Sequence, residues 1–297
     1  MKSFSLSEKA VLLKFEKGSF FVYNDLKYTV TNSGKPTSST GEPKTDIYVE
    51  AKSDSGDIVE FKISYKQPNA DFLENKINAI RAEQILGQGW KQVIISSVSN
   101  LESKFKNRKL VFKTKGSRTE KGSITLGWKF EILDKPGGEL SAKIDLTLEQ
   151  KLDIFSGTNL GEDKKDARVN GVKILNSGIS NFVLYGKDYD DLQSIVDSLI
   201  PIKEYCKDAD LYFACKALNY RTFRKKWDGN RPLCVYVDWF VIADRLDHKI
   251  IFNAPFAEGN KVAKNLIKSM VSLAISNTDD IIESNMVDWR AVKDDEE

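Results

Sequence analysis

Apolar spacing along the first hundred residues predicts five structural elements. Residues 6–17 carry apolar side chains at helical spacing, which predicts a first helix that ends at a glycine. Residues 45–49 and 58–65 predict two strands joined by a Ser/Gly/Asp-rich turn, which makes a hairpin. Residues 69–86 predict an amphipathic helix, and residues 92–98 a short strand buried on both faces. This order predicts an α/β (α+β) fold, a mixed β-sheet core flanked by helices.

The remaining two thirds of the chain predict further elements but no repeat. Strands are expected at 20–30 (or a turn), 123–133, 141–146 and 233–242, and helices at 147–155, 189–206, 211–218 and 261–275. Thr147 is the expected cap of its helix, and Pro201 interrupts the next one. We expect a core at residues 1–115 and an elaborated C-terminal lobe at residues 116–297 that packs on the same core.

Composition excludes several classes of enzyme. The chain has 297 residues, of which 41% are hydrophobic and 30% charged, with three cysteines and one histidine. No stretch approaches the ~20 apolar residues that span a bilayer, and the N-terminus lacks the apolar segment of a secretory signal, so we expect a cytoplasmic protein with reduced thiols and no membrane partner. A zinc site that needs several His ligands cannot be built, and His248 lies on a stretch that we expect to be solvated. Hydrolytic chemistry would therefore need carboxylates, lysines and an oxygen-liganded metal.

The net charge of +2 conceals a strong segregation of charge. Residues 101–130 hold nine Lys and Arg against two Glu, and residues 216–232 hold six against one Asp, whereas the last twenty residues are acidic. The second block interleaves aromatic residues with its cations, so its charges could reach phosphates or guanine edges. Two basic blocks in a near-neutral protein indicate a binder of polyanions.

One hairpin carries the candidate chemistry. Asp46 opens the first strand, and Glu60 and Lys62 lie on one face of the second. Two carboxylates that converge across a hairpin, with a lysine two residues beyond the second, would form an oxygen-ligand site for Mg²⁺. The metal could hold a phosphate and activate water, and the lysine could balance charge in the transition state.

The string Pro43-Lys44-Thr45-Asp46, followed by Glu60-Phe61-Lys62, resembles the PD-(D/E)XK nucleases and, among them, the type II restriction endonucleases. The proline stands two residues further from the aspartate than the motif name implies. The resemblance covers about residues 1–100 and implies a restriction-endonuclease-like core that cleaves double-stranded DNA with Mg²⁺. The alternatives are a structure-specific or phage-encoded DNA-processing nuclease of the same fold, and a nucleic-acid-binding protein without activity.

The resemblance does not decide whether Lys62 or Lys66 is the catalytic lysine. Some relatives carry Ile-Ser-x-Lys, which Ile63-Ser64-Tyr65-Lys66 matches, but Glu60 with Lys62 is favoured because a carboxylate is the better ligand. The family often recruits a further acid from the N-terminal helix, and Glu16 is preferred to Glu8 for that role. Gln67 could orient water or substrate.

Contacts with DNA are expected from basic residues of two segments. The first segment offers Arg81, with Lys76 on the same polar side of the helix, and the second offers Arg221, Arg224, Lys225, Lys226 and Arg231. Trp128, Trp239, Trp227 and Phe223 are expected in the core. Because cutting both strands of a symmetric site needs two active sites, we expect a homodimer on DNA.

Overall fold

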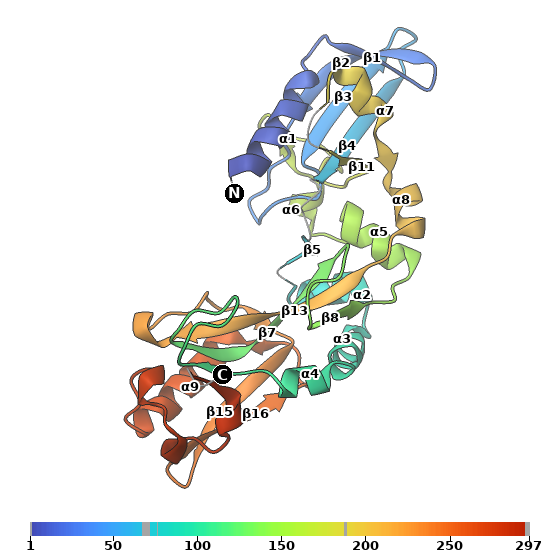
Figure 1. The fold of residues 1–297 in the computed structure, drawn as a ribbon. Coiled ribbons are helices and arrows are strands. Elements are labelled where there is room, and N and C mark those ends of the chain that lie inside the picture. The colour runs from blue at the N-terminus through green and yellow to red at the C-terminus, as the bar shows by residue number, and fades with distance from the viewer. Residues whose placement is uncertain (1, 67–71, 76, 187–188, 295–297) are drawn as a thin grey trace. The chain divides into compact units, whose positions relative to one another are not determined.

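The computed structural model describes residues 2–66, 72–75, 77–186 and 189–294 (Figure 1). Two compact units divide the chain: unit 1 comprises Met1–Asp71 and Asp145–Asp210, and unit 2 comprises Phe72–Ile144 and Leu211–Glu297. Each unit is therefore built from two separate segments, whereas the sequence suggested a single boundary at residue 115. The boundary between the two units depends on which distant strands pair, so no local change in amino-acid composition marks it.

Unit 1 is a mixed six-stranded sheet in the order β1-β2-β3-β4-β11-β12. Strands β1 to β4 form an antiparallel meander, and β11 returns to pair in parallel with β4. The crossover between β4 and β11 includes all of the first segment of unit 2 and, within unit 1, the helix α5. The elements of unit 1 are α1 (Lys2–Lys14), β1 (Phe20–Tyr23), β2 (Leu26–Gly34), β3 (Ile47–Ser53), β4 (Ile58–Lys66), α5 (Leu148–Ser156), α6 (Glu162–Lys165), β9 (Arg168–Val169), β10 (Val172–Lys173), β11 (Phe182–Tyr185), α7 (Leu192–Asp197), β12 (Ile200–Pro201) and α8 (Ile202–Asp208).

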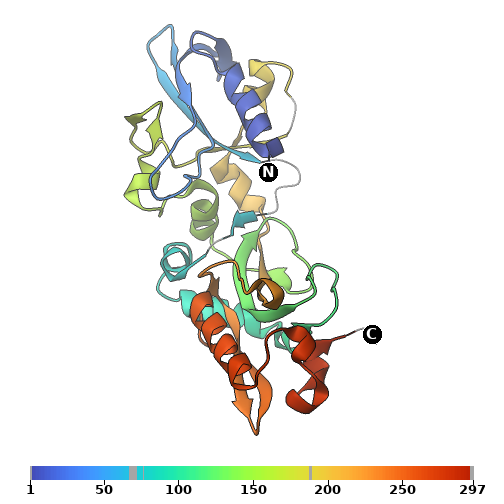
Figure 2. The same ribbon diagram turned by 90° about the vertical axis from the view of Figure 1, so that its left-hand side faces the viewer.

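The alternation of β4 determines which side chains leave the core of unit 1. Phe61 is fully buried, and its ring lies 5.3 Å from Phe21, 5.1 Å from Tyr23 and 5.3 Å from Phe182. Helix α1 lies across this apolar face (Figures 1 and 2), where Phe15 is also fully buried. A shift of the β4 pairing register by one residue would move all of its apolar side chains to the opposite face of the sheet. The packing of this aromatic cluster therefore determines which face the polar residues of β4 occupy.

Unit 2 is built on the long strand β7. Its sheet runs β16-β15-β7-β13-β8, while β5 and β6 also pair with β7 and β18 pairs with β6. Helix α9 packs beside β15 (Figure 2). The elements are β5 (Phe72–Glu74), α2 (Ala79–Leu86), α3 (Trp90–Ser99), α4 (Glu102–Lys106), β6 (Val111–Phe112), β7 (Ser123–Leu133), β8 (Ser141–Lys143), β13 (Tyr212–Arg221), β14 (Pro232–Leu233), β15 (Val235–Ile242), β16 (Arg245–Ile251), β17 (Ala257–Glu258), α9 (Gly259–Ser272) and β18 (Val292–Lys293), with four short 3₁₀ turns at Thr222–Arg224, Thr278–Asp280, Glu283–Asn285 and Trp289–Ala291.

The mixed α/β character, the hairpin β3–β4, the strand β7 and the helices α5 and α9 agree with the sequence prediction. Thr147 caps α5 as expected, with a reciprocal bond from Gln150. Three predictions were wrong. Residues 92–98 lie in a helix, residues 211–218 lie mostly in strand β13, and the helix expected from residue 69 begins at Ala79, after the short strand β5.

Each error has a local reason. In α3 the buried residues Trp90, Ile94 and Val98 are four apart, so the same apolar run fits a helix as well as a strand. β13 pairs with β7 on one side and, at its start, with β8 on the other, and its continuous apolar run has no alternation. Asn78 caps α2 by accepting from the Arg81 backbone N–H, a cap signal inside the predicted helix.

Within the described ranges, every helix is too short or too polar to cross a membrane.

Candidate active site

Asp46 lies at the entry to β3, where the backbone of β4 holds it in place. Its N–H donates to the Ile63 carbonyl at 2.8 Å, and its Oδ2 accepts from the Tyr65 N–H at 2.8 Å. The strands pair with Ile47 opposite Ile63 and Glu50 opposite Glu60. Continued by one position, this register places Asp46 opposite Ser64.

The two carboxylates expected to converge therefore lie apart. Glu60 is four positions along β4 from Ser64, which at ~3.3 Å per residue is about 13 Å. That separation is too large for Asp46 and Glu60 to bind one metal ion directly. The expected convergence of Asp46 with Glu60 was wrong, because the spacing between two motif residues does not determine the strand register.

The surroundings of Asp46 perturb its acidity. Burial raises its pKa to about 6, and Glu8 acts in the same direction. The Lys66 charge, the Tyr65 hydrogen bond and the Lys35 charge oppose that rise. A carboxylate that is buried this far has a free-energy cost of ionisation that a bound cation would relieve.

Glu8 of α1 extends this cluster of charges. It forms an ion pair with Lys35 at 2.8 Å, and its side chain is only 19% exposed. Burial alone would lower the pKa of Lys35, but Glu8, Asp46 and Glu42 outweigh it and raise the pKa. Glu16, the acid preferred from the sequence, is exposed and lies beyond the end of α1. The helical residue that interacts with Asp46 is therefore Glu8.

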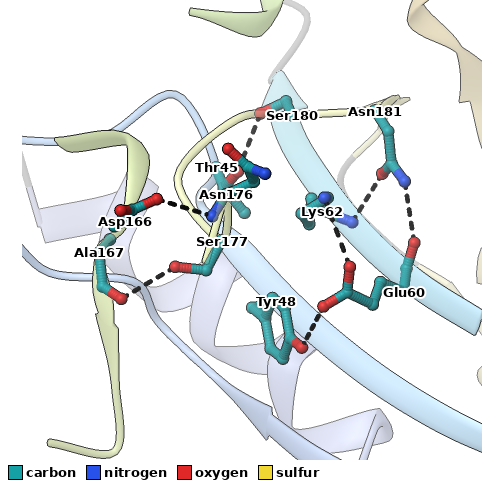
Figure 3. A network of polar contacts seen from close by, with 10 residues as sticks. All are labelled: Thr45, Tyr48, Glu60, Lys62, Asp166, Ala167, Asn176, Ser177, Ser180 and Asn181. Atoms are coloured by element: carbon teal, nitrogen blue, oxygen red, sulfur yellow. Dashed lines mark hydrogen bonds and ion pairs between the residues drawn. The ribbon is translucent and has the colours of Figure 1, made fainter. Parts of the chain in front are cut away.

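Glu60 and Lys62 belong to a separate polar network (Figure 3). Glu60 accepts from the Tyr48 hydroxyl at 2.6 Å and pairs with the Lys62 ammonium at 3.5 Å. The Asn181 side chain accepts from the Lys62 N–H at 2.7 Å and donates to the Glu60 carbonyl at 2.8 Å. Burial raises the pKa of Tyr48, which keeps its hydroxyl protonated as the donor to Glu60. These contacts satisfy both charged residues within the protein.

The loop before β11 anchors the start of β3 (Figure 3). The Gly178 carbonyl accepts from the N–H groups of Lys44 and Thr45 at 3.2 and 3.3 Å, and the Thr45 hydroxyl lies 3.3 Å from that of Ser180. Gly178 packs so closely that a Cβ there would lie 1.8 Å from the Lys164 carbonyl oxygen. This close approach fixes the backbone immediately before Asp46. No sequence pattern indicated Gly178, Asn181 or Lys35, because their roles depend on chain segments that are distant in sequence.

The carboxylates of Asp46 and Glu8 are oxygen ligands of the type that hard cations take. In the part of the chain that the structure describes, no three His, Cys, Asp or Glu side chains gather as a metal cluster. Mg²⁺ typically binds through one or two carboxylates, several waters and substrate phosphates, so three are not required. Ser64 is fully buried, and its Oγ has no hydrogen-bond partner among the described residues. Asp46 and Glu8 are thus the carboxylates that could hold Mg²⁺, with Ser64 beside them.

The expected DNA-binding residues all lie in unit 2 and differ in their availability. Arg221 is held by Glu120 at 2.5 Å and by Asp228 at 2.9 and 3.1 Å. The three exposed cations that follow it, here called the basic turn, are Arg224, Lys225 and Lys226. Of these, Arg224 also pairs with Glu120 at 3.1 Å but remains 67% exposed. The basic turn is therefore the accessible part of the block.

Several other expectations differ from the structure. Arg81 is buried in an ion pair with Glu74 at 2.7 Å rather than on a polar face, and Phe223 is 51% exposed. His248 is half-buried beside Trp239, and burial lowers its pKa. Gln67 and Lys76 fall outside the described residues. Trp128 and Trp239 are buried as predicted, and Trp227 is partly buried, with its ring N–H bonded to Asn260.

Comparison with protein families, curated proteins and solved structures gave no match for this chain.

Proposed function

We propose that the protein is a Mg²⁺-dependent endodeoxyribonuclease of the PD-(D/E)XK type, most simply a type II restriction enzyme, that hydrolyses phosphodiester bonds in double-stranded DNA. The observation that carries the proposal is the register of the β3–β4 hairpin. It sets Asp46 opposite Ser64, two residues before Lys66, at the end of a fixed strand. This is the Ile-Ser-x-Lys arrangement, so we assign the site to Asp46 and Lys66 rather than to Glu60 and Lys62.

The residues of this cluster have distinct proposed roles. Asp46 and Glu8 would hold Mg²⁺, which when bound attracts the phosphate and lowers the pKa of the attacking water. Lys66 lies close enough for its charge to act on Asp46. Its ammonium can therefore orient the nucleophile and balance negative charge in the transition state. Lys35 neutralises Glu8 in the absence of a ligand.

The topology of unit 1 supports the same proposal. Helix α1 covers an antiparallel hairpin that carries the motif, and the next strand of the sheet, β11, pairs in parallel with β4 after a crossover that contains α5. A mixed sheet flanked by helices is the core that the resemblance implies, although its crossover helix and parallel strand are α5 and β11 rather than the segments expected at 69–86 and 92–98. The basic turn of unit 2 supplies accessible cations for a polyanion.

The test is incubation of the full chain with long duplex DNA and Mg²⁺. Discrete fragments would indicate a restriction enzyme, a smear would indicate a processing nuclease, and shifted but uncut DNA would indicate a binder without activity. Asp46→Ala should reduce cleavage at least ~10²-fold while DNA binding persists, because a ligand of the metal is lost. Asp54→Ala, in the exposed turn between β3 and β4, is the matched control. Cleavage by Asp46→Ala within ~10-fold of the wild type would exclude the site.

A further inference from the structure

Unit 2 contains a polar pocket of about 430 Å³ beside β7, which contributes Lys129 and Glu131 to its lining. Its lining residues are Asn75, Lys129, Glu131, Asp228 and Arg231. The volume falls in the range of small-molecule sites, ~300–1,000 Å³. Such sites usually have a mainly apolar lining with a few polar groups that orient a ligand. Here all five lining residues are polar or charged.

Arg231 is the residue of the pocket that is free to bind. It is half-buried, and its guanidinium has no hydrogen-bond or ion-pair partner among the described residues. Its backbone is nevertheless fixed, because its carbonyl accepts from the Gly259 N–H at 3.0 Å and a Cβ on Gly259 would lie 2.8 Å from that oxygen. Trp227 and Asn230 both bond to Asn260, which ties the same loop to the start of α9. Because the backbone of the loop is already fixed, binding would order only the side chain of Arg231 and not the loop.

The two carboxylates of the pocket are held in place by cations. Asp228 is bound through both oxygens by Arg221, which lowers the pKa of Asp228 and keeps it an acceptor. Glu131 is almost fully buried and pairs with Lys129 at 3.4 Å and Lys216 at 3.2 Å. The pocket thus presents two carboxylates that are held in place beside the guanidinium of Arg231, which is available to donate.

This balance of charge selects a class of ligand. The lining residues carry two positive and two negative charges, so a phosphate would face two carboxylates and a metal ion would face two cations. A planar neutral group with donors and acceptors on one edge matches the lining. The Watson–Crick edge of a nucleobase is such a group, and Arg, Lys, Asn and carboxylate side chains are the residues that pair with base edges.

We propose that this pocket of unit 2 binds a single nucleobase that has left the DNA stack, with Arg231 donating to its acceptor edge and Asp228 accepting from its amino or imino group. The pocket is concave, whereas a base edge in the floor of a groove is reached by a protruding side chain, so an extruded base is the form of DNA that fits. The inference rests on the proposed DNA-binding function, but not on cleavage.

Fluorescent duplexes test the pocket without cleavage. The full chain is titrated, without Mg²⁺, with a matched duplex and with duplexes that carry one mismatched base of each kind. Because a mismatch lowers the cost of extrusion by up to a few kcal/mol, at least one mismatched base should bind ~10-fold more tightly than the matched duplex. 2-Aminopurine at that position, or as its neighbour in the strand, should brighten when the base unstacks.

Two variants distinguish base binding from phosphate binding. Arg231→Ala should remove the preference for the mismatch and leave the salt dependence nearly unchanged, while Arg118→Ala, an exposed arginine of the same unit, should retain the preference. If Arg231→Ala instead weakened binding equally to all duplexes and reduced the slope of log affinity against log salt, Arg231 would be a phosphate contact and the inference would be overturned. So would the absence of DNA binding, the absence of a mismatch preference in the wild type, or a preference that survives Arg231→Ala.

The same titration separates this inference from the nuclease. A mismatch preference that depends on Arg231, in a protein that cuts no DNA with Mg²⁺, would retain the pocket and remove the proposed activity. Cleavage without any preference would do the reverse.

Discussion

Replacing Asp46 with asparagine should stabilise unit 1, although Asp46 is the residue on which we expect cleavage to depend. The ordinary pKa of aspartate is ~3.9, and burial raises that of Asp46 to about 6. The folded state therefore binds the proton more tightly than the unfolded chain does. The wild type should lose stability as the pH rises from about 4 to about 6, and the loss should stay constant above that range.

The size of the effect follows from the shift. About 2 pKa units at 1.36 kcal/mol each give an upper limit of ~3 kcal/mol. Because Asp46 keeps some contact with solvent, we expect about 1–2 kcal/mol at pH 8 and nearly none at pH 4. Asparagine retains an oxygen that can accept from the Tyr65 N–H, so the strand contact is preserved. At a slope of ~1–3 kcal/mol per molar urea, the midpoint should rise by roughly 0.3–2 M.

The assay must report unit 1 separately. All five tryptophans lie in unit 2, so their fluorescence reports on unit 2 and cannot serve as the measure for unit 1. Amide hydrogen exchange of β3 and β4 in unit 1, at pH 8 and at low pH, measures the expected gain. Asp54→Asn in the exposed turn should change stability by less than ~0.5 kcal/mol at either pH.

Divalent cations provide the second half of the test. Mg²⁺ or Ca²⁺ at ten times its dissociation constant should stabilise wild-type unit 1 by ~1.4 kcal/mol, and Asp46→Asn should lose that response. The reasoning would be refuted if Asp46→Asn were less stable than the wild type at pH 8, if its gain were equally large at pH 4, or if it responded to the cation as the wild type does.

Three further predictions concern catalysis, binding and assembly. In a cleavage assay, Lys66→Ala should reduce the rate at least ~10²-fold. Lys62→Ala should reduce it much less, because the Lys62 ammonium pairs with Glu60. The reverse ranking would restore the assignment of the site to Glu60 and Lys62. Neutralising the basic turn should reduce the slope of log affinity against log salt by up to ~0.9 per phosphate contact, and an unchanged slope would mean that the turn does not touch DNA. Sedimentation of Asp46→Ala with one cognate duplex and Ca²⁺ should show two chains per duplex; one chain would exclude the homodimer but not the nuclease.

The sequence predicted those parts of the fold whose signal is local. The alternation of β4, the apolar run of strand β7 and the cap Thr147 are each contained in about ten consecutive residues. It failed at α3 and β13, where short apolar runs fit both a helix and a strand, so neighbouring elements determine the outcome. The division into two discontinuous units was also beyond reach, because it depends on β11 pairing with β4 across more than a hundred residues.

The candidate site illustrates the same limit at the level of side chains. Sequence reasoning identified Asp46, Glu60, Lys62 and Lys66 as one group, because all of them lie on a single hairpin. The strand register divides them into two pairs. Glu60 accepts a hydrogen bond from Tyr48 and forms an ion pair with Lys62, whereas the positive charge of Lys66 acts on Asp46.

Asp46, the proposed metal ligand, and Glu60 differ in the contacts that their carboxylates make within the protein. The Glu60 carboxylate already accepts from a hydroxyl and pairs with an ammonium, so its charge is balanced within the protein. Burial raises the pKa of Asp46, which lies opposite Ser64 in the hairpin, and the Ser64 hydroxyl has no hydrogen-bond partner among the described residues. A folded protein keeps such a costly arrangement where a ligand relieves it, and functional sites are where these arrangements concentrate. That asymmetry, rather than the spacing of the motif, is the physical reason to place the chemistry at Asp46 and Lys66.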